Sequence, residues 1–282
     1  MNLLQYITWN VDPEIFNIGF FSLRWYGLLF ASGFFIGQFL MIKMYKNDGR
    51  LEKDVDSLTM YMLIATVLGA RLGHCFFYDP EYYLSNPIKI FKVWEGGLAS
   101  HGAAIGILTG LWMYSKKYNH RFLWVVDRVV VVVALAGGFI RMGNLMNSEI
   151  VGIPSDLPWA FLFERLGDYK SYLVEVNGQL SNVPRHPVQL YEAITYFITF
   201  GVLWKLYWSK GKELAEGRLF GLFLVLVFGF RIVWEFLKVH QADFMMGLEL
   251  RMGQLLSIPL VLAGFYFLLR KTSSEKKEAN IS

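Results

Sequence analysis

The chain has 282 residues, of which 55% are hydrophobic, 17% are aromatic and only 18% are charged. This composition is typical of an integral membrane protein, and a net charge of +4 gives no sign of a nucleic-acid partner. The single cysteine, Cys75, excludes an internal disulfide and is expected to be a small buried apolar residue.

Long apolar stretches follow one another along the chain, and each can cross a hydrocarbon core of ~30 Å as a helix. They predict seven transmembrane helices, at residues 18–42, 58–77, 98–115, 125–146, 188–208, 219–237 and 252–269. These spans use most of the chain, and no internal repeat is detectable. We therefore expect a single membrane domain over residues 1–282. The predicted fold class is an all-α polytopic membrane protein.

The longest polar connection, residues 147–187, predicts a small exposed cap between the fourth and fifth spans. Within it, residues 172–183 place an Asn-Gly pair between alternating apolar runs, which is a strong short-range signal for a β-hairpin. The first seventeen residues lack Lys and Arg, so we expect a short translocated tail and not a cleaved signal peptide. The polar residues 272–282 predict a disordered tail.

The distribution of Lys and Arg between alternate connections predicts the orientation in the membrane, because cytoplasmic loops retain positive charge. One set of connections carries fifteen: these are residues 43–53, 116–121, 205–218 and 270–277. The other set carries seven: these are residues 89–92, 165–185 and 238–251. The N-terminus and the cap are therefore expected outside and the C-terminus in the cytoplasm.

Polar residues within the predicted spans gather in their outer halves. An ionised group at the bilayer centre costs ~2.5 to 3.5 kcal/mol even on the lenient insertion scale, so such groups are seldom without a role. Several of them at one level, on different helices, indicate a shared polar cavity. They are Arg24, Tyr26, Arg71, His74, His101, Arg141, Asn144, Glu192, Arg231 and Glu235.

Each of these residues also has a structural interpretation. Arg24 and Arg71 are each expected to extend toward lipid headgroups when considered alone. Arg231 and Glu235 are spaced i, i+4, so a purely structural ion pair explains them as well as a functional one. His101 starts a run of glycines spaced by four and could be a hydrogen-bonded packing residue.

Arg141, Asn144 and Ser148 are spaced i, i+3, i+7, which predicts that one helical face carries all three. Nearby glycines, at 137, 138 and 143, would allow that helix to be approached closely or to unwind. Two arginines on separate helices, Arg141 and Arg231, accompanied by a histidine and amides, suit the binding of a phosphate group in the outer leaflet.

Five motifs carry a resemblance to a known family. They are HGAAIG (101–106), GGFIRMGNLMNSE (137–149), HPVQLYE (186–192), GFRIVWEF (229–236) and MGQLLSIP (252–259). In this order, and over nearly the full length, they resemble the bacterial prolipoprotein diacylglyceryl transferases. The sequence departs from the family at His74, where an aromatic hydroxyl is common, and at Ala103, where glycine is frequent.

The resemblance implies an enzyme that transfers the diacylglyceryl group of phosphatidylglycerol to the lipobox cysteine thiol of a prolipoprotein signal peptide. The products would be a thioether and glycerol phosphate, in the first step of lipoprotein maturation. It also implies the bacterial plasma membrane, with membrane lipids around the protein and the active site toward the outer leaflet. The alternative function is a lipid or anion transporter or flippase, in which the same arginines would bind an anion transiently.

The resemblance also implies roles for individual residues. Arg141 and Arg231 would stabilise the leaving phosphate charge, and His101 would take the proton of the thiol, unless Glu149 or Glu192 serves as the base. Further residues would complete the catalytic and lipid-binding site. Those residues are Tyr26, Gly102, Asn144, Asn147, Glu149 and Glu235, the last of which would fix Arg231. The sequence contains no metal-ligand cluster and no nucleotide motif, so we expect no metal and no cofactor.

Overall fold

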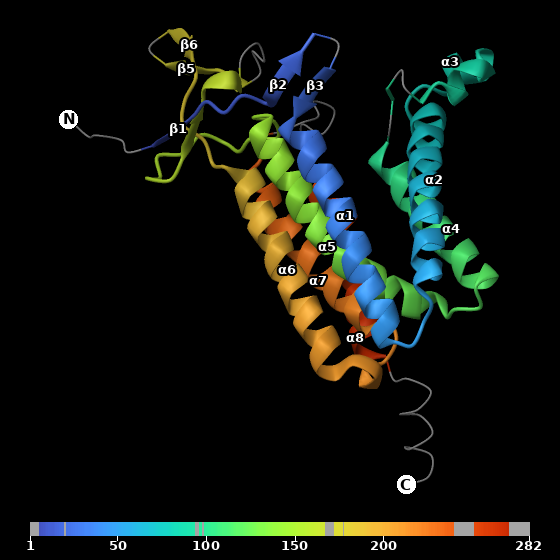
Figure 1. Cartoon of the computed structure of the whole chain (residues 1–282). Coiled ribbons are helices and arrows are strands. Elements are labelled where there is room, and N and C mark those ends of the chain that lie inside the picture. The colour runs from blue at the N-terminus through green and yellow to red at the C-terminus, as the bar shows by residue number, and fades with distance from the viewer. Residues whose placement is uncertain are drawn as a thin grey trace. The chain divides into compact units, whose positions relative to one another are not determined.

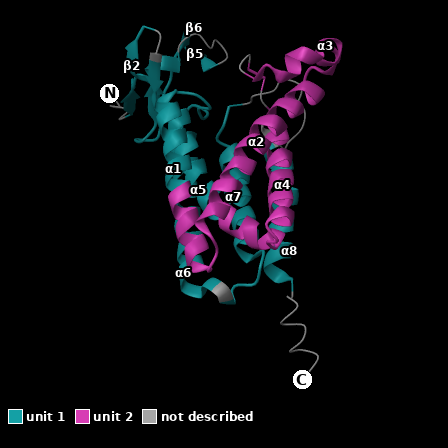
Figure 2. Ribbon diagram, turned by 45° about the vertical axis from the view of Figure 1, so that its right-hand side comes forward, with its two compact units in different colours: residues 1–37, 130–282 teal, residues 38–129 magenta. Residues whose placement is uncertain are grey.

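A computed structural model of the chain describes residues 6–19, 21–93, 96–97, 99–166, 172–176, 178–239 and 251–270. The chain divides into two compact units. The first unit comprises Met1–Gly37 and Val130–Ser282, and the second comprises Gln38–Val129. Figure 2 colours the first unit teal and the second magenta. The expectation of a single domain stays a prediction.

Five long helices contribute to the first unit. They are α1 (Trp25–Asn47), α5 (Phe122–Met146), α6 (Val188–Lys210), α7 (Arg218–Glu235) and α8 (Met252–Leu269), of which α1 and α5 continue into the second unit. Helix α7 packs against both α6 and α8 (Figure 1). The α7–α8 contact is close because glycines meet there: a Cβ atom at Gly221 would lie 2.8 Å from the carbonyl oxygen of Gly264. A short 3-10 helix, η5 (Gly211–Glu213), follows α6.

The second unit is built on the antiparallel pair α2 (Glu52–Phe77) and α4 (Ser100–Lys117), joined by α3 (Pro80–Ser85) and the 3-10 helix η1 (Pro87–Phe91). The run of glycines spaced by four, Gly102, Gly106 and Gly110, lies in this interface. A Cβ atom at Gly102 would lie 2.2 Å from the carbonyl oxygen of Gly69, and one at Gly106 would lie 2.2 Å from that of Ala65. Since no side chain fits between them, the backbones of α2 and α4 are in direct contact.

In the structure the cap contains residues 7–24 in addition to parts of residues 147–187, and it is built from small strands of the first unit. β1 (Ile7–Trp9) pairs in parallel with β4 (Phe161–Phe163), which continues into the 3-10 helix η3 (Glu164–Leu166). β2 (Glu14–Ile18) pairs antiparallel with β3 (Phe21–Arg24), and β5 (Val174–Val176) pairs antiparallel with β6 (Gln179–Ser181). The cap core contains buried apolar side chains with Trp9 packed against them. Its buried members are Leu145, Val151, Phe161, Phe163 and Leu166.

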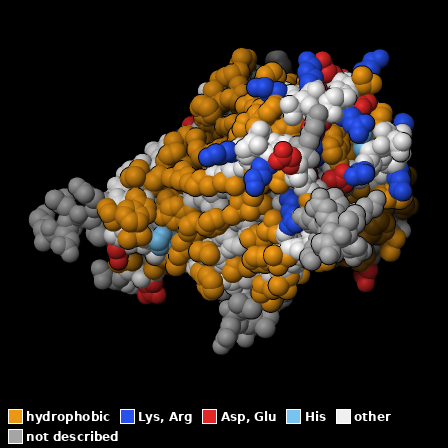
Figure 3. Space-filling model, turned by 90° about the horizontal axis from the view of Figure 1, so that it is seen from below, with side chains coloured by type: hydrophobic (Ala, Val, Ile, Leu, Met, Phe, Trp, Pro, Cys, Tyr) orange, Lys and Arg blue, Asp and Glu red, His pale blue; other side chains and the backbone are white. Residues whose placement is uncertain are grey.

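Long helices occupy the positions of all seven predicted spans. By length and composition, three of the described helices, α1, α2 and α5, are long and apolar enough to cross a membrane, and α8 contains the shorter apolar segment Gly253–Leu269. Large apolar side chains are exposed along α1, α2 and α8. Figure 3 shows many hydrophobic side chains on one face of the molecule. These features agree with a helical membrane protein.

Two expectations from the sequence need correction. The first predicted span began at residue 18, but α1 begins at Trp25, and residues up to Arg24 form the β2–β3 hairpin. An ion pair of 2.8 Å between Arg24 and Glu14 closes this hairpin, and Arg24 is 61% exposed. The strands β1 to β4 were not predicted, because the fold was expected to be all-α apart from one hairpin in the cap. The hairpin predicted within 172–183 is confirmed as β5–β6, whereas the predicted tail at 272–282 lies outside the described residues.

Candidate active site

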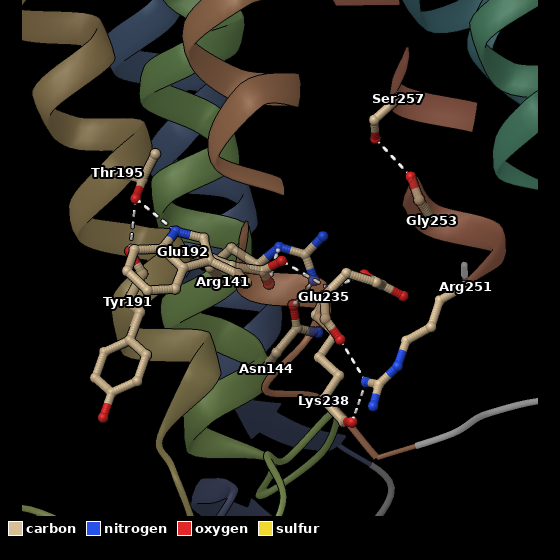
Figure 4. Close-up of polar contacts among 11 residues, drawn as sticks. Arg141, Asn144, Tyr191, Glu192, Thr195, Glu235, Lys238, Arg251, Gly253 and Ser257 are labelled. Carbon is tan, nitrogen blue, oxygen red and sulfur yellow. Dashed lines mark hydrogen bonds and ion pairs between the residues drawn. The ribbon is translucent and has the colours of Figure 1, made fainter. Parts of the chain in front are cut away.

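The candidate site of the first unit lies where helices end beside the cap. Arg141 and Asn144 lie in the last two turns of α5, Glu192 lies in the second turn of α6, and Glu235 ends α7. Lys238 follows α7 after one further turn. Figure 4 shows these five side chains close together. Because the helices alternate in direction, ends far apart in the sequence reach one level.

Charged side chains at this level alternate in sign. Nε of Arg141 lies 3.0 Å from Oε2 of Glu192, and Oε1 of Glu192 lies 2.8 Å from Nζ of Lys238. Nζ of Lys238 also lies 3.2 Å from Oε2 of Glu235. All four side chains are largely buried. Two cations and two anions therefore balance within one network across α5, α6 and the end of α7. We call these four residues the buried ion network.

Arg231 is the cation that this network does not neutralise. The expected Arg231–Glu235 ion pair is not formed in the described part of the chain, where the carboxylate of Glu235 pairs with Lys238 instead. Nε of Arg231 is buried and has no hydrogen-bond partner among the described residues. With Arg141, Glu192 and Tyr196, Arg231 lines a narrow pocket whose volume is about 10 Å³, close to the space that one water molecule needs. This pocket therefore has a net positive charge.

Arg141 also continues the polar contacts toward the cap. Its Nη1 donates a hydrogen bond of 3.4 Å to Oδ1 of Asn144, whose Nδ2 donates one of 2.7 Å to Oε1 of Glu149. Nδ2 of Asn147 donates to the same oxygen at 3.3 Å. The amides of Asn144 and Asn147 thus orient the exposed Glu149 carboxylate. Ser148 does not extend this face, because α5 ends at Met146 and Ser148 has a φ of 53°.

Glycines let other side chains approach this region. A Cβ atom at Gly143 would lie 2.7 Å from the ring of Tyr26, so this ring packs directly on the backbone of α5. A Cβ atom at Gly253, at the start of α8, would lie 2.6 Å from the carboxylate carbon of Glu235. Only glycine leaves room for these contacts. Helix α5 continues through its glycines, so they permit close approach and do not unwind it.

The start of α8 is tied to the end of α7. Nη1 of Arg251 donates hydrogen bonds to the carbonyl oxygens of Glu235 and Lys238. Nε2 of Gln254 donates one of 3.1 Å to the carbonyl oxygen of Ile232. The last carbonyl groups of a helix have no partner within the helix. Arg251 and Gln254 donate to carbonyl groups at the end of α7 and so hold the backbone of Glu235 and Lys238 in place.

Two residues that were predicted for the site, His101 and Gly102, belong to the second unit. His101 is the second residue of α4; its side chain is exposed and makes no hydrogen bond to any residue that the structure describes. Gly102 is buried against Gly69 and Gly73 of α2. The packing role of the glycine is therefore clear, whereas the imidazole of His101 is available for another partner.

A model of the family described as prolipoprotein diacylglyceryl transferase matches residues 13–270. The chain belongs to the prolipoprotein diacylglyceryl transferase family. It is 44% identical over 279 residues to the phosphatidylglycerol–prolipoprotein diacylglyceryl transferase of Chloroherpeton thalassium, covering 99% of both chains. It is 45% identical over 264 residues to that of Tolumonas auensis, covering 93% of this chain and 96% of the relative. It is 42% identical to that of Porphyromonas gingivalis, covering 96% of each.

In this member of the transferase family, a layer of aromatic and polar side chains supports the pocket. Nε1 of Trp234 donates a hydrogen bond of 2.9 Å to Oγ1 of Thr195. Nε1 of Trp159 donates one of 3.0 Å to the hydroxyl of Tyr191, which also lies 3.3 Å from Nδ1 of His186. Burial lowers the pKa of His186, so this ring is neutral at physiological pH. These contacts hold the start of α6 beside the candidate site.

The sequence pattern missed the residues that connect the others in this candidate site. Lys238 was counted only as a loop charge, and Glu192 was noted without a partner. Gln189 was not singled out, although its Nε2 donates a hydrogen bond of 2.6 Å to the carbonyl oxygen of Glu149 and its side chain is buried. The available signal was the spacing Gln189–Glu192, which places an amide and a carboxylate on one face of α6.

Proposed function

We propose that this protein transfers the diacylglyceryl group of phosphatidylglycerol to the lipobox cysteine thiol of prolipoproteins. In this reaction the bond between the glyceryl carbon and the phosphate oxygen breaks as the carbon–sulfur bond forms. The thiol gives up its proton, and glycerol phosphate leaves. Family membership over nearly the whole chain supports this reaction.

The structural observation that supports the proposal best is the buried Nε of Arg231, which has no hydrogen-bond partner among the described residues and lies beside Arg141 in one pocket. A buried guanidinium is stable only when an anion or carbonyl groups satisfy it. Nε of Arg231 lacks such a partner in the described part of the chain, and the residue lines a pocket with Arg141. A phosphate group would supply the missing anion, and its negative charge increases as the bond to the glyceryl carbon breaks. Arg231, with Arg141, would therefore bind the leaving group more tightly in the transition state.

The other predicted residues are assigned around this phosphate. Asn144, Asn147 and Glu149 would contact the lipid headgroup, and Tyr26 would close the wall beside α5. Gly102 would serve the site through the close packing of α4. Glu235 would act through Lys238, which it contacts, and not through Arg231.

His101 is proposed to take the proton of the substrate thiol. A free thiol has a pKa of ~8.5, so attack at neutral pH benefits from a base. Among the described residues, nothing else engages the exposed imidazole. Glu149, which is exposed, remains the alternative base; Glu192 is less suited because it already pairs with Arg141 and Lys238.

The membrane arrangement forms part of this proposal. We infer seven crossings, formed by α1, α2, α4, α5, α6, α7 and α8, with the N-terminus outside and the C-terminus in the cytoplasm. The excess of Lys and Arg in one set of connections supports this orientation. The polar helix ends would then lie in the outer leaflet of the bacterial plasma membrane, where the exported lipobox peptide arrives.

The decisive experiment is reconstitution. The purified protein would be incorporated into vesicles that contain phosphatidylglycerol labelled in the glyceryl moiety, and a lipobox peptide would be added. Transfer of label to the peptide as a thioether, with release of glycerol phosphate, is the expected result. A peptide with Ser in place of the lipobox Cys should accept none. Movement of labelled lipid between leaflets without thioether formation would support a flippase instead.

A further inference from the structure

Arg71, near the end of α2, is one of the most buried charged residues in the second unit, with 2% exposure. The sequence alone suggested that Arg71 extends toward lipid headgroups, but the side chain points into the protein. Its Nε donates a hydrogen bond of 3.0 Å to the carbonyl oxygen of Ile90, and its Nη2 donates to that of Lys89. Its Nη1 donates to the carbonyl oxygens of Gly96 and, at 3.4 Å, Gly97. All three nitrogens therefore bind main chain.

This guanidinium binds carbonyl groups at turns of the connection. Lys89 and Ile90 lie in the last turn of η1, where the carbonyl oxygen of Lys89 also accepts a hydrogen bond of 3.2 Å from the amide of Lys92. Gly96 and Gly97 have positive φ angles of 88° and 69°, so they turn the chain sharply beside the same side chain. The guanidinium carbon also lies 5.0 Å from the ring centre of Tyr83 in α3. One arginine thus joins three stretches of the connection between α2 and α4.

The connection between α2 and α4, which Arg71 contacts, leads directly to His101. The amide of Ala99 donates a hydrogen bond of 2.9 Å to the carbonyl oxygen of Ala70, the neighbour of Arg71 in α2. Helix α4 starts at the next residue, and Gly102 packs on the backbone of Gly69 and Gly73. The backbone at His101 is therefore fixed on both sides. The imidazole has no hydrogen bond to any described residue, so only this backbone placement orients it.

We propose that Arg71 is a positioning residue for the transfer reaction, and that it acts by fixing the start of α4 and hence His101. This inference rests on the proposed function, in which His101 takes the proton of the thiol. In that step the proton moves from sulfur to the imidazole, the carbon–sulfur bond forms, and glycerol phosphate leaves with the electron pair of the carbon–oxygen bond. Arg71 contacts neither substrate.

The planar shape of the guanidinium explains why arginine is needed. Its nitrogens point in fixed directions and reach carbonyl groups on separate turns, whereas the ammonium of lysine is a single point on a flexible chain. Arg71→Lys keeps the charge and loses this geometry. A misplacement of about 1 Å costs on the order of 10²-fold in rate, so Arg71→Lys should lower kcat by about that factor. The KM for phosphatidylglycerol should change little, because the proposed phosphate site lies on α5 and α7.

A double-mutant cycle separates positioning from general destabilisation. Transfer rates would be measured for Arg71→Lys, His101→Gln and the double variant in vesicles. If Arg71 acts through His101, the double variant should lie within about twofold of His101→Gln alone. Independent effects would multiply, and that result would overturn the inference. Wild-type kcat in Arg71→Lys would overturn it as well.

Arg185 provides a matched control. It is also 2% exposed and also binds main chain, since its Nη1 donates a hydrogen bond of 3.1 Å to the carbonyl oxygen of Gly152 and its Nη2 donates to that of Tyr172. It belongs to the first unit. Arg185→Lys should combine multiplicatively with His101→Gln. If Arg71→Lys acted only by lowering thermal stability, Arg185→Lys should have a similar effect. Neither variant would then show a non-multiplicative effect on the transfer rate when combined with His101→Gln.

A measurement without turnover distinguishes failure of this inference from failure of the proposed function. Diethyl pyrocarbonate acylates accessible imidazoles, and mass spectrometry of the peptide that contains His101 gives the rate. Arg71→Lys should change the rate at His101 and leave His186 unchanged. An unchanged rate at His101 would overturn the inference. If His101→Gln turns over at the wild-type rate, His101 is not the base, and this modification rate alone decides whether Arg71 places the ring.

Gly97→Ala tests the same contact if Arg71→Lys does not fold. A Cβ atom there would lie 3.0 Å from Nη1 of Arg71 and 2.5 Å from the ring of His74, at a φ that alanine rarely adopts. It should lower kcat and couple to His101→Gln in the same way. Multiplicative behaviour of Gly97→Ala would count against the inference.

Discussion

Glu192 and Lys238 form a buried ion pair: Oε1 and Nζ are 2.8 Å apart, and the side chains are 4% and 8% exposed. The other oxygen of Glu192 faces Arg141, so one carboxylate compensates two cations from different segments. Removal of one partner from a buried pair leaves an uncompensated charge, which typically costs ~3 to 5 kcal/mol. Glu192 is therefore the residue on which the buried ion network depends most.

Glu192→Gln should consequently lower the thermal unfolding temperature and abolish transfer. The double variant Glu192→Gln/Arg141→Met should recover part of the stability, because it removes the cation that Glu192→Gln leaves without a carboxylate, whereas Lys238 keeps its pair with Glu235. Unfolding would be followed in detergent by circular dichroism. Glu14→Gln is the control: its pair with Arg24 is exposed, and such pairs contribute little to stability. Equal unfolding temperatures for Glu192→Gln and the wild type would show that the pair is not formed.

Arg141→Ala and Arg231→Ala should abolish transfer while the protein still inserts and folds. Lysine at either position should restore little activity, because an ammonium does not reproduce the two parallel hydrogen bonds of a guanidinium to phosphate. Arg231→Ala should destabilise the protein less than Arg141→Ala, since only Arg141 pairs with Glu192. Arg165→Ala, in an exposed pair with Asp12, is the control for loss of an arginine. Full activity in either alanine variant would remove that arginine from the mechanism.

His101→Gln should retain lipid binding and lose ~10²- to 10⁴-fold in rate, the usual contribution of a general base. Higher pH should recover part of this loss, because it supplies the substrate thiolate directly. The measurement is the pH dependence of kcat for both proteins. If His101 only packs against the helix pair, the variant should instead unfold at lower temperature and show no recovery at high pH.

Gly69→Ala should destabilise the second unit. The added Cβ atom would lie 2.4 Å from the carbonyl oxygen of Gly102, and overpacking of this kind costs roughly 1 to 3 kcal/mol. Gly229 of α7 is also within a helix, but no atom lies within 4 Å of its added Cβ. Gly229→Ala should therefore leave stability unchanged or raise it by up to ~1 kcal/mol. Thermal unfolding of the two variants tests the contrast, and equal shifts would contradict it.

Cysteine labelling tests the proposed orientation. Glu175→Cys, in the exposed strand β5, should react with a membrane-impermeant maleimide in intact cells. Lys210→Cys, at the opposite end of α6, should react only after the cells are permeabilised. The native Cys75 is buried and should give no background. The reverse pattern would place the candidate site on the cytoplasmic side.

The helices were predictable because apolar length is a property of local sequence. The start of the first helix was not predictable, because apolar residues such as Phe21 and Leu23 fit a β-strand as well as a transmembrane helix. These residues belong to β3, which pairs antiparallel with β2, and an apolar run alone does not report such a partner strand. The β5–β6 hairpin was predictable because the Asn-Gly pair encodes the turn locally.

The candidate site residues could be chosen one by one from the sequence, but the ion pairs between them could not. The i, i+4 spacing favoured an Arg231–Glu235 pair, but Glu235 lies nearer to Lys238, which also serves Glu192 of another helix. Sequence spacing reports contacts along one helix and contains no information about which helices are neighbours. Arg71 shows the same limit: its carbonyl partners lie 18 to 26 residues away, in a connection without a recognisable motif.

The parallel pairing of β1 with β4 has a consequence for synthesis. Ile7–Trp9 leaves the ribosome early, whereas its partner Phe161–Phe163 follows about 150 residues later. At roughly 5 to 20 residues per second, the first strand waits on the order of 8 to 30 s for its partner. During that time Trp9 has no apolar core to enter. The β1–β4 pair therefore forms only after α5 has been made, and a bulky fusion joined close to Ile7 would delay this late step without contacting any long helix.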